Sequence, residues 1–175
     1  MSTIDKDAAV AEIREMMHDN YAGPPGTIEA ACLFWAKATC IVLEGRGLRA
    51  IVQAGSAGWP RIDEADDDGE VNTHFSYVWE PDSPSSIAAV KAYRMPEMHV
   101  WAAMPDTQTI IDVTSGFQPG QCLTTLGMDW PGTKPPEYIW STPEGMYGKC
   151  FYKADITAIG LAFEMYRNSE WGERK

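Results

Sequence analysis

A histidine and an aspartate occupy two neighbouring segments that both have the alternating pattern of a β-strand. His99 lies in the segment Met98–Ala103 and Asp112 lies in the segment Thr109–Val113, with Pro105 at the turn between them. Because residues two apart in a strand share a face, antiparallel pairing of these segments can place the two side chains next to each other. A histidine with a carboxylate behind it provides the base and the orienting group of a nucleophilic triad.

Two candidates for the nucleophile lie in the segment from Thr27 to Glu44, which has the strongest helical pattern in the chain. Its apolar residues recur at helical spacing and its few charged residues form one narrow stripe, so we expect a buried central helix. Thr27 occupies the predicted N-cap of this helix. Cys32 would then lie about one and a half turns inside the helix. That position favours a thiol packed as a small hydrophobic group over a displaced nucleophile, and both assignments stay open.

The surrounding elements predict an α+β fold in which the central helix packs on a mainly antiparallel sheet. The strand patterns cover Leu48–Ala54, Thr73–Glu80, Met98–Ala103 and Thr109–Val113. Further helices are expected over 2–20 and after Asp155, which has the position of an N-cap. The acidic run 63–70 predicts a solvated loop. The segment 116–136, rich in glycine and proline, predicts a long irregular loop with a functional or covering role.

Composition restricts the class of protein. The length of 175 residues and the hydrophobic fraction of 45% are typical of one globular domain over residues 1–175. The net charge of −11 argues against nucleic-acid binding through a basic groove. No apolar run is long enough to cross a membrane and no signal-peptide pattern is present, so we expect a cytoplasmic protein without membrane contact. The cysteines have no CxxC spacing, so we expect neither a metal site nor a disulfide framework, and no cofactor: Cys32, Cys40, Cys122 and Cys150.

The order of these motifs resembles the papain-like fold in its transglutaminase-like form. The central helix is followed by the strand Gly47-Leu-Arg-Ala-Ile-Val52, then by His99-Val-Trp101 and then by Asp112-Val-Thr114. In that family a cysteine at the start of the central helix attacks an acyl carbon. The histidine of a His-x-Trp strand is the base, and the aspartate of an Asp-x-Thr strand orients it. The resemblance covers roughly residues 26–116.

The resemblance implies catalytic positions for His99 and Asp112, but it departs from the family at the nucleophile. The helix start Gly26-Thr27-Ile-Glu-Ala-Ala31 is similar to the Asn-Cys-x-x-Ala-Ala of small papain-like proteins of phages and bacteria, with Thr27 where the cysteine stands. An internal threonine lacks the terminal amine that activates threonine nucleophiles. Thr27 in this position therefore predicts an inactive site.

Two functions follow from the two candidate nucleophiles. With Thr27 in the nucleophile position, the chain is a catalytically degenerate papain-like protein, related to those of phages, that serves as a binding or structural module for a protein or peptide partner. With Cys32 as the nucleophile, it is a cysteine peptidase, amidase or acyltransferase. The sequence pattern favours the first of these functions. In either case Asn20 is expected as an oxyanion donor and Trp101 as a substrate contact.

Overall fold

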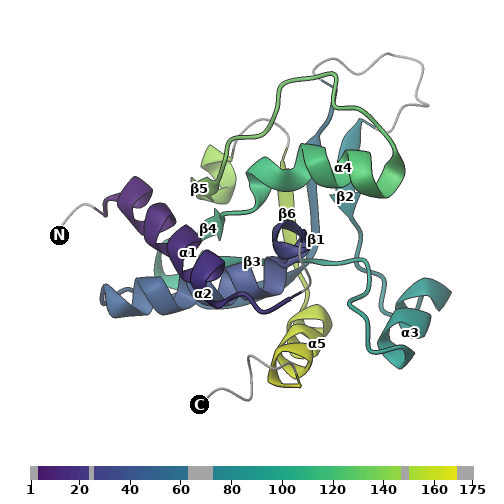
Figure 1. Cartoon of the computed structure of the whole chain (residues 1–175), viewed down its shortest axis with the longest axis horizontal. Coiled ribbons are helices and arrows are strands. Elements are labelled where there is room, and N and C mark those ends of the chain that lie inside the picture. Colours follow the sequence, from purple (N-terminus) through teal and green to yellow (C-terminus); the bar gives the residue numbers. More distant parts are fainter. Residues whose placement is uncertain (1–3, 24–25, 63–72, 147–149, 169–175) are drawn as a thin grey trace.

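The structure is a computed structural model that describes residues 4–23, 26–62, 73–146 and 150–168. No helix among these residues is both long and apolar enough to cross a membrane. The predicted acidic loop 63–70 lies outside the described residues. The described residues form five α-helices and six β-strands (Figure 1): α1 (Lys6–Asn20), α2 (Cys32–Gly45), β1 (Ile51–Pro60), β2 (His74–Tyr77), α3 (Pro84–Lys91), β3 (His99–Met104), β4 (Thr109–Asp112), α4 (Gln118–Leu126), β5 (Ile139–Ser141), β6 (Phe151–Ala154) and α5 (Ile156–Arg167).

The strands form one antiparallel sheet in which β1 has the most partners (Figure 1). The first half of β1 pairs with β3, from Ile51 opposite Ala103 to Gly55 opposite His99. The second half of β1 pairs with β2, and the residues Gly55–Gly58 pair with β6. β4 pairs with β3, and β5 pairs with β4. The start of β3 and the end of β6 therefore meet at the same residue of β1.

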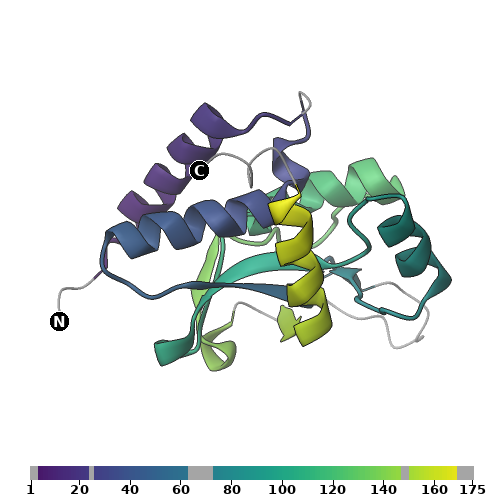
Figure 2. The same ribbon diagram turned by 90° about the horizontal axis from the view of Figure 1, so that it is seen from below.

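Helices α1 and α2 pack against each other and against the sheet, and they enclose the main core. Figure 2 shows α2 lying along the sheet, with α5 crossing near the N-terminal end of α2. The buried residues of this core come from four elements: Val10, Ile13 and Met17 of α1, Trp35, Val42 and Leu43 of α2, Ala102 of β3 and Ile111 of β4. Helix α5 packs on β1 through the small residues Ala158 and Ala162. The predicted α+β fold, with a buried helix on an antiparallel sheet, is confirmed.

The central helix begins later than predicted. Helix α2 starts at Cys32, and the residues Ile28–Ala30 before it form a separate 3₁₀ turn. Ala31 separates the two pieces with a ψ of 46°, outside the helical region. The side chain of Trp35 stabilises this break, because its Nε1 donates to the carbonyl of Ile28 at 2.7 Å. Helical spacing of apolar residues runs through both pieces, so the pattern alone predicted one continuous helix.

The segment 116–136 is not irregular throughout, and that prediction was wrong in part. It contains α4, in which Pro119 lies in the first turn, where a missing N–H group removes no helical hydrogen bond. Gly127 ends the helix with a φ of 65°, a left-handed conformation that glycine adopts without strain. The proline and the glycine that suggested a loop therefore mark the two ends of a helix.

Candidate functional site

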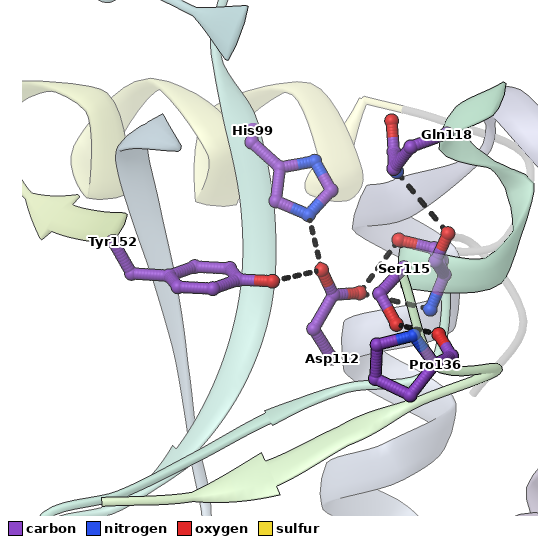
Figure 3. Close-up of polar contacts among 7 residues, drawn as sticks. His99, Asp112, Ser115, Gln118, Pro136 and Tyr152 are labelled. Carbon is purple, nitrogen blue, oxygen red and sulfur yellow. Dashed lines mark hydrogen bonds and ion pairs between the residues drawn. The ribbon is translucent and has the colours of Figure 1, made fainter. Parts of the chain in front are cut away.

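The site is built around a buried pair of His99 and Asp112. His99 is the first residue of β3 and Asp112 is the last residue of β4, and the two strands are antiparallel neighbours. The Nε2 atom of His99 lies 2.9 Å from Oδ2 of Asp112, and each side chain is only 2% exposed (Figure 3). The predicted contact between the two residues is therefore present.

The carboxylate of Asp112 is held by three further hydrogen bonds. Its Oδ1 accepts from the backbone N–H of Thr114 at 2.8 Å and from the hydroxyl of Thr114 at 2.6 Å. Its Oδ2 accepts from the hydroxyl of Tyr152 at 2.7 Å, across the sheet from β6 (Figure 3). Burial alone would raise the pKa of Asp112, but the charge of His99 and these donors hold it below its ordinary value. Asp112 is therefore ionised at neutral pH, and its hydrogen bonds hold the carboxylate in one orientation.

The charge of His99 follows from the same contacts. Burial would lower the pKa of this imidazole, but the charge of Asp112 and the hydrogen bond to it raise the pKa to about 10. Cys32 also contributes to this rise, so its side chain lies near the ring. Because Asp112 occupies Nε2, Nδ1 is the ring nitrogen that remains for Cys32. At neutral pH the imidazole is protonated, and it lies between a carboxylate and the side chain of Cys32.

Cys32 is the first residue of α2, so the interpretation that it lies inside the central helix was wrong. The first N–H groups of a helix have no partner within it and carry the positive end of the helix dipole. Cys32 is 9% exposed and lines a pocket of about 510 Å³. A cysteine at a helix start, near a protonated imidazole and in the wall of a pocket, has the surroundings in which cysteines act as nucleophiles.

The contacts of two predicted site residues, Thr27 and Asn20, differ from those that a nucleophile position and an oxyanion donor would have. Thr27 precedes the 3₁₀ turn instead of opening α2, and its hydroxyl hydrogen-bonds the hydroxyl of Tyr21 at 2.9 Å. The placement of Thr27 at the start of the central helix was therefore wrong. Asn20 is exposed at the end of α1, where its side-chain amide donates to the carbonyl of Met16 at 2.8 Å. This contact within its own helix does not support the role of Asn20 as an oxyanion donor.

Aromatic rings enclose the imidazole of His99. Trp101 lies nearly parallel to it, with 6.1 Å between ring centroids, and Tyr77 does so at 5.6 Å. Trp59 meets the imidazole edge-on at 5.0 Å. Trp101 is 3% exposed and packs on the imidazole of His99, so its expected role as a substrate contact is not supported. The rings restrict the imidazole to one orientation.

Several residues of this site were not found by sequence analysis. Tyr77 could have been found, because its strand alternates and places aromatic residues on one face. Tyr152 and Gln118 come from distant segments with no local signal. Gln118 is 2% exposed and its Nε2 donates to the carbonyl of Thr114 at 3.1 Å, while its Oε1 has no partner among the described residues (Figure 3).

Within the described part of the chain, no three His, Cys, Asp or Glu side chains are grouped so that they could hold a metal ion. The side chains that the site brings together are those of Cys32, His99 and Asp112.

Comparisons with known proteins identify the fold alone. No protein-family model and no curated protein matches the chain. Among solved structures, the chain is similar to the one described as "The crystal structure of genomics APC5867", with a TM-score of 0.52 and 11% sequence identity. The similarity covers 95% of this chain and 70% of that chain. At this identity the comparison supports the arrangement of helices on a curled antiparallel sheet and carries no function.

Proposed function

We propose that the protein is a cysteine-dependent acyl-transfer enzyme of the papain-like, transglutaminase-like type, acting as a peptidase or amidase. Cys32 is the nucleophile, His99 is the acid and base, and Asp112 orients His99. One observation carries the proposal: Cys32 opens α2 beside an imidazole whose other nitrogen lies 2.9 Å from a buried carboxylate. This is the arrangement of nucleophile, base and orienting group that acyl transfer requires.

The reaction proceeds in two steps. The thiolate of Cys32 attacks the acyl carbon, the bond to the leaving amine breaks, and His99 donates its Nδ1 proton to that amine. Water then attacks the resulting thioester while His99 accepts a proton from it, which releases the acid and restores the thiolate and the imidazolium.

Asp112 and the groups around it keep the imidazole ready for both steps. The carboxylate is anchored on Thr114 and Tyr152, so it cannot rotate away from His99 without losing several hydrogen bonds. An imidazole held in one orientation reaches both the sulfur and the leaving group without reorganisation.

The alternative of a catalytically degenerate binding module depends on Thr27 as the residue that replaces the nucleophile. Its support is weaker, because Thr27 lies ahead of the 3₁₀ turn and its hydroxyl is engaged with Tyr21. The two functions make opposite predictions for the reactivity of Cys32.

The test is the rate at which iodoacetamide alkylates each cysteine of the folded protein at pH 7, measured by mass spectrometry of the peptides. We expect Cys32 to react at least about tenfold faster than a small model thiol. Cys40 should be slow, because burial raises its pKa to about 11. Cys150 should also be slow, because burial raises its pKa to about 12.

The control is His99→Gln, with its fold checked by circular dichroism. This variant should lose the fast reaction of Cys32 and leave the rate at Cys40 unchanged. If Cys32 in the unaltered protein reacts no faster than the model thiol, the enzyme proposal fails and the binding module is favoured.

A further inference from the structure

The pocket at Cys32 is formed by elements that are far apart in the chain. It has a volume of about 510 Å³, within the range of pockets that bind small organic groups. Its apolar lining comes from the first turn of α2, from α3 and the segment after it, and from α5: Phe34, Val90, Met95, Leu161 and Met165. Cys32 itself forms part of the wall, so a group bound here contacts this residue.

The polarity of the pocket is uneven. The charged side chains that line it, Arg94 and Glu164, belong to exposed residues. Leu161 and Met165 are at least half-buried and pack against the same core as Cys32. Phe34 is also at least half-buried and packs against the main core. The interior of the pocket therefore offers mainly apolar contacts, with charged groups toward solvent.

The position of His99 decides which part of a substrate can enter the pocket at Cys32. The leaving group must face His99, because that ring donates its proton. His99 does not belong to the described residues that line the pocket, whereas Cys32 does. A group bound in the pocket therefore contacts Cys32 without contacting His99, which suits the acyl substituent and not the leaving group.

We propose that this pocket selects substrates with an apolar group on the acyl side of the bond that is broken. The group is either a fatty acyl chain or the large apolar side chain of an acylating amino acid, which share the same chemistry. This inference rests on the proposed function of Cys32 and adds its substrate class. Each buried methylene can contribute about a fourfold gain in acylation rate.

The experiment measures acylation of Cys32 by p-nitrophenyl esters, from the release of nitrophenol and the mass of the acyl-enzyme. One arm compares the acetyl and hexanoyl esters, and the other compares the N-acetylglycyl and N-acetylphenylalanyl esters. All rates are divided by those of a small model thiol. In one arm we expect the larger group to raise the relative acylation rate at least about tenfold. The arm with the larger gain in rate identifies the source of the apolar group.

Two positions on α3 provide matched variants. Val90 and Ile87 are 41% and 43% exposed, but only Val90 lines the pocket. Val90→Glu should reduce the gain for the larger group at least about threefold, since it places a charge in the pocket wall. Ile87→Glu should leave both the gain and the acetyl rate as they are in the unaltered protein.

The outcomes separate this inference from the function on which it rests. If Cys32 is acylated by the acetyl and acetylglycyl esters but neither arm shows a gain, the inference is overturned and the enzyme proposal stands. Equal losses in Val90→Glu and Ile87→Glu would also overturn the inference. If no ester acylates Cys32, the enzyme proposal and the inference fall together.

Discussion

At the scale of single residues, Asp112 is the most constrained group of the site. A buried carboxylate is tolerated only when its oxygens are paired, and here His99, Thr114 and Tyr152 supply the pairing. Tyr152 is suited to this role. Burial and the charge of Asp112 both raise the pKa of its phenol well above the ordinary value, so it remains a hydrogen-bond donor over the usual pH range.

Removing the donor from Tyr152 should therefore weaken the fold. We expect Tyr152→Phe to lower the free energy of unfolding by about 2 kcal/mol, because a hydrogen bond to a buried charge is lost. Urea denaturation at pH 7 measures this change. Tyr93→Phe is the matched control, since Tyr93 is 92% exposed, and it should have no measurable effect. Equal stabilities of the two variants would show that the Tyr152 hydroxyl does not support Asp112.

At the scale of elements, the junction at Gly55 determines how the site is assembled. Gly55 of β1 pairs with His99 of β3 and with Ala154 of β6. It has a φ of 153°, and a Cβ atom added to it would lie 2.1 Å from the carbonyl oxygen of Lys153. Only glycine allows β6 to come this close, and this approach brings Tyr152 within reach of Asp112.

Gly55→Ala should therefore disturb the site through β6. We expect a loss of about 3 kcal/mol in the free energy of unfolding, because the backbone of Lys153 must move away from β1. Urea denaturation checks this value against Gly160→Ala in α5. A Cβ at Gly160 meets no atom within 4 Å, so that change should stabilise the helix by roughly 0.5–1 kcal/mol. A Gly55→Ala protein as stable as the unaltered one would contradict the close packing of β6 on β1.

At the scale of the whole molecule, the buried ion pair links folding to pH. The folded state holds the pKa of His99 at about 10, against about 6.5 for an exposed histidine. Between these values the folded chain binds a proton that the unfolded chain releases, so stability falls as pH rises through this range. The contribution of Asp112 to stability has the opposite dependence on pH. Its pKa is lowered in the folded state, so its contribution is lost as pH falls below about 4.

The unaltered protein should accordingly be least resistant to urea at the two ends of the pH range. We expect Asp112→Asn to cost about 3 kcal/mol at pH 6 and clearly less at pH 9.5, where His99 in the unaltered protein has begun to lose its proton. Urea denaturation across this range, for both proteins, measures the difference. A cost that is the same at both pH values would mean that His99 is neutral in the folded protein.

Local patterns in the sequence were sufficient to predict the helices and strands in which the direction of the side chains repeats with a fixed period. Alternation along two strands joined by a short connection predicted the contact between His99 and Asp112, because side chains in a strand repeat every second residue. The spacing of apolar residues predicted the buried central helix on an antiparallel sheet, and the side chain of Asp155 was correctly assigned as the N-cap of α5.

Only the tertiary structure decided which residue opens the central helix and what surrounds the site. Trp35 holds the carbonyl of Ile28 and so separates the 3₁₀ turn from α2, which moves Cys32 from inside a predicted helix to its first residue. Tyr152 reaches Asp112 from a strand forty residues further along the chain. Such contacts depend on how distant segments pack, and packing at one position leaves no periodic signal in the residues around it. The sequence by itself therefore determined the contact between His99 and Asp112, and the folded chain determined that Cys32 opens α2.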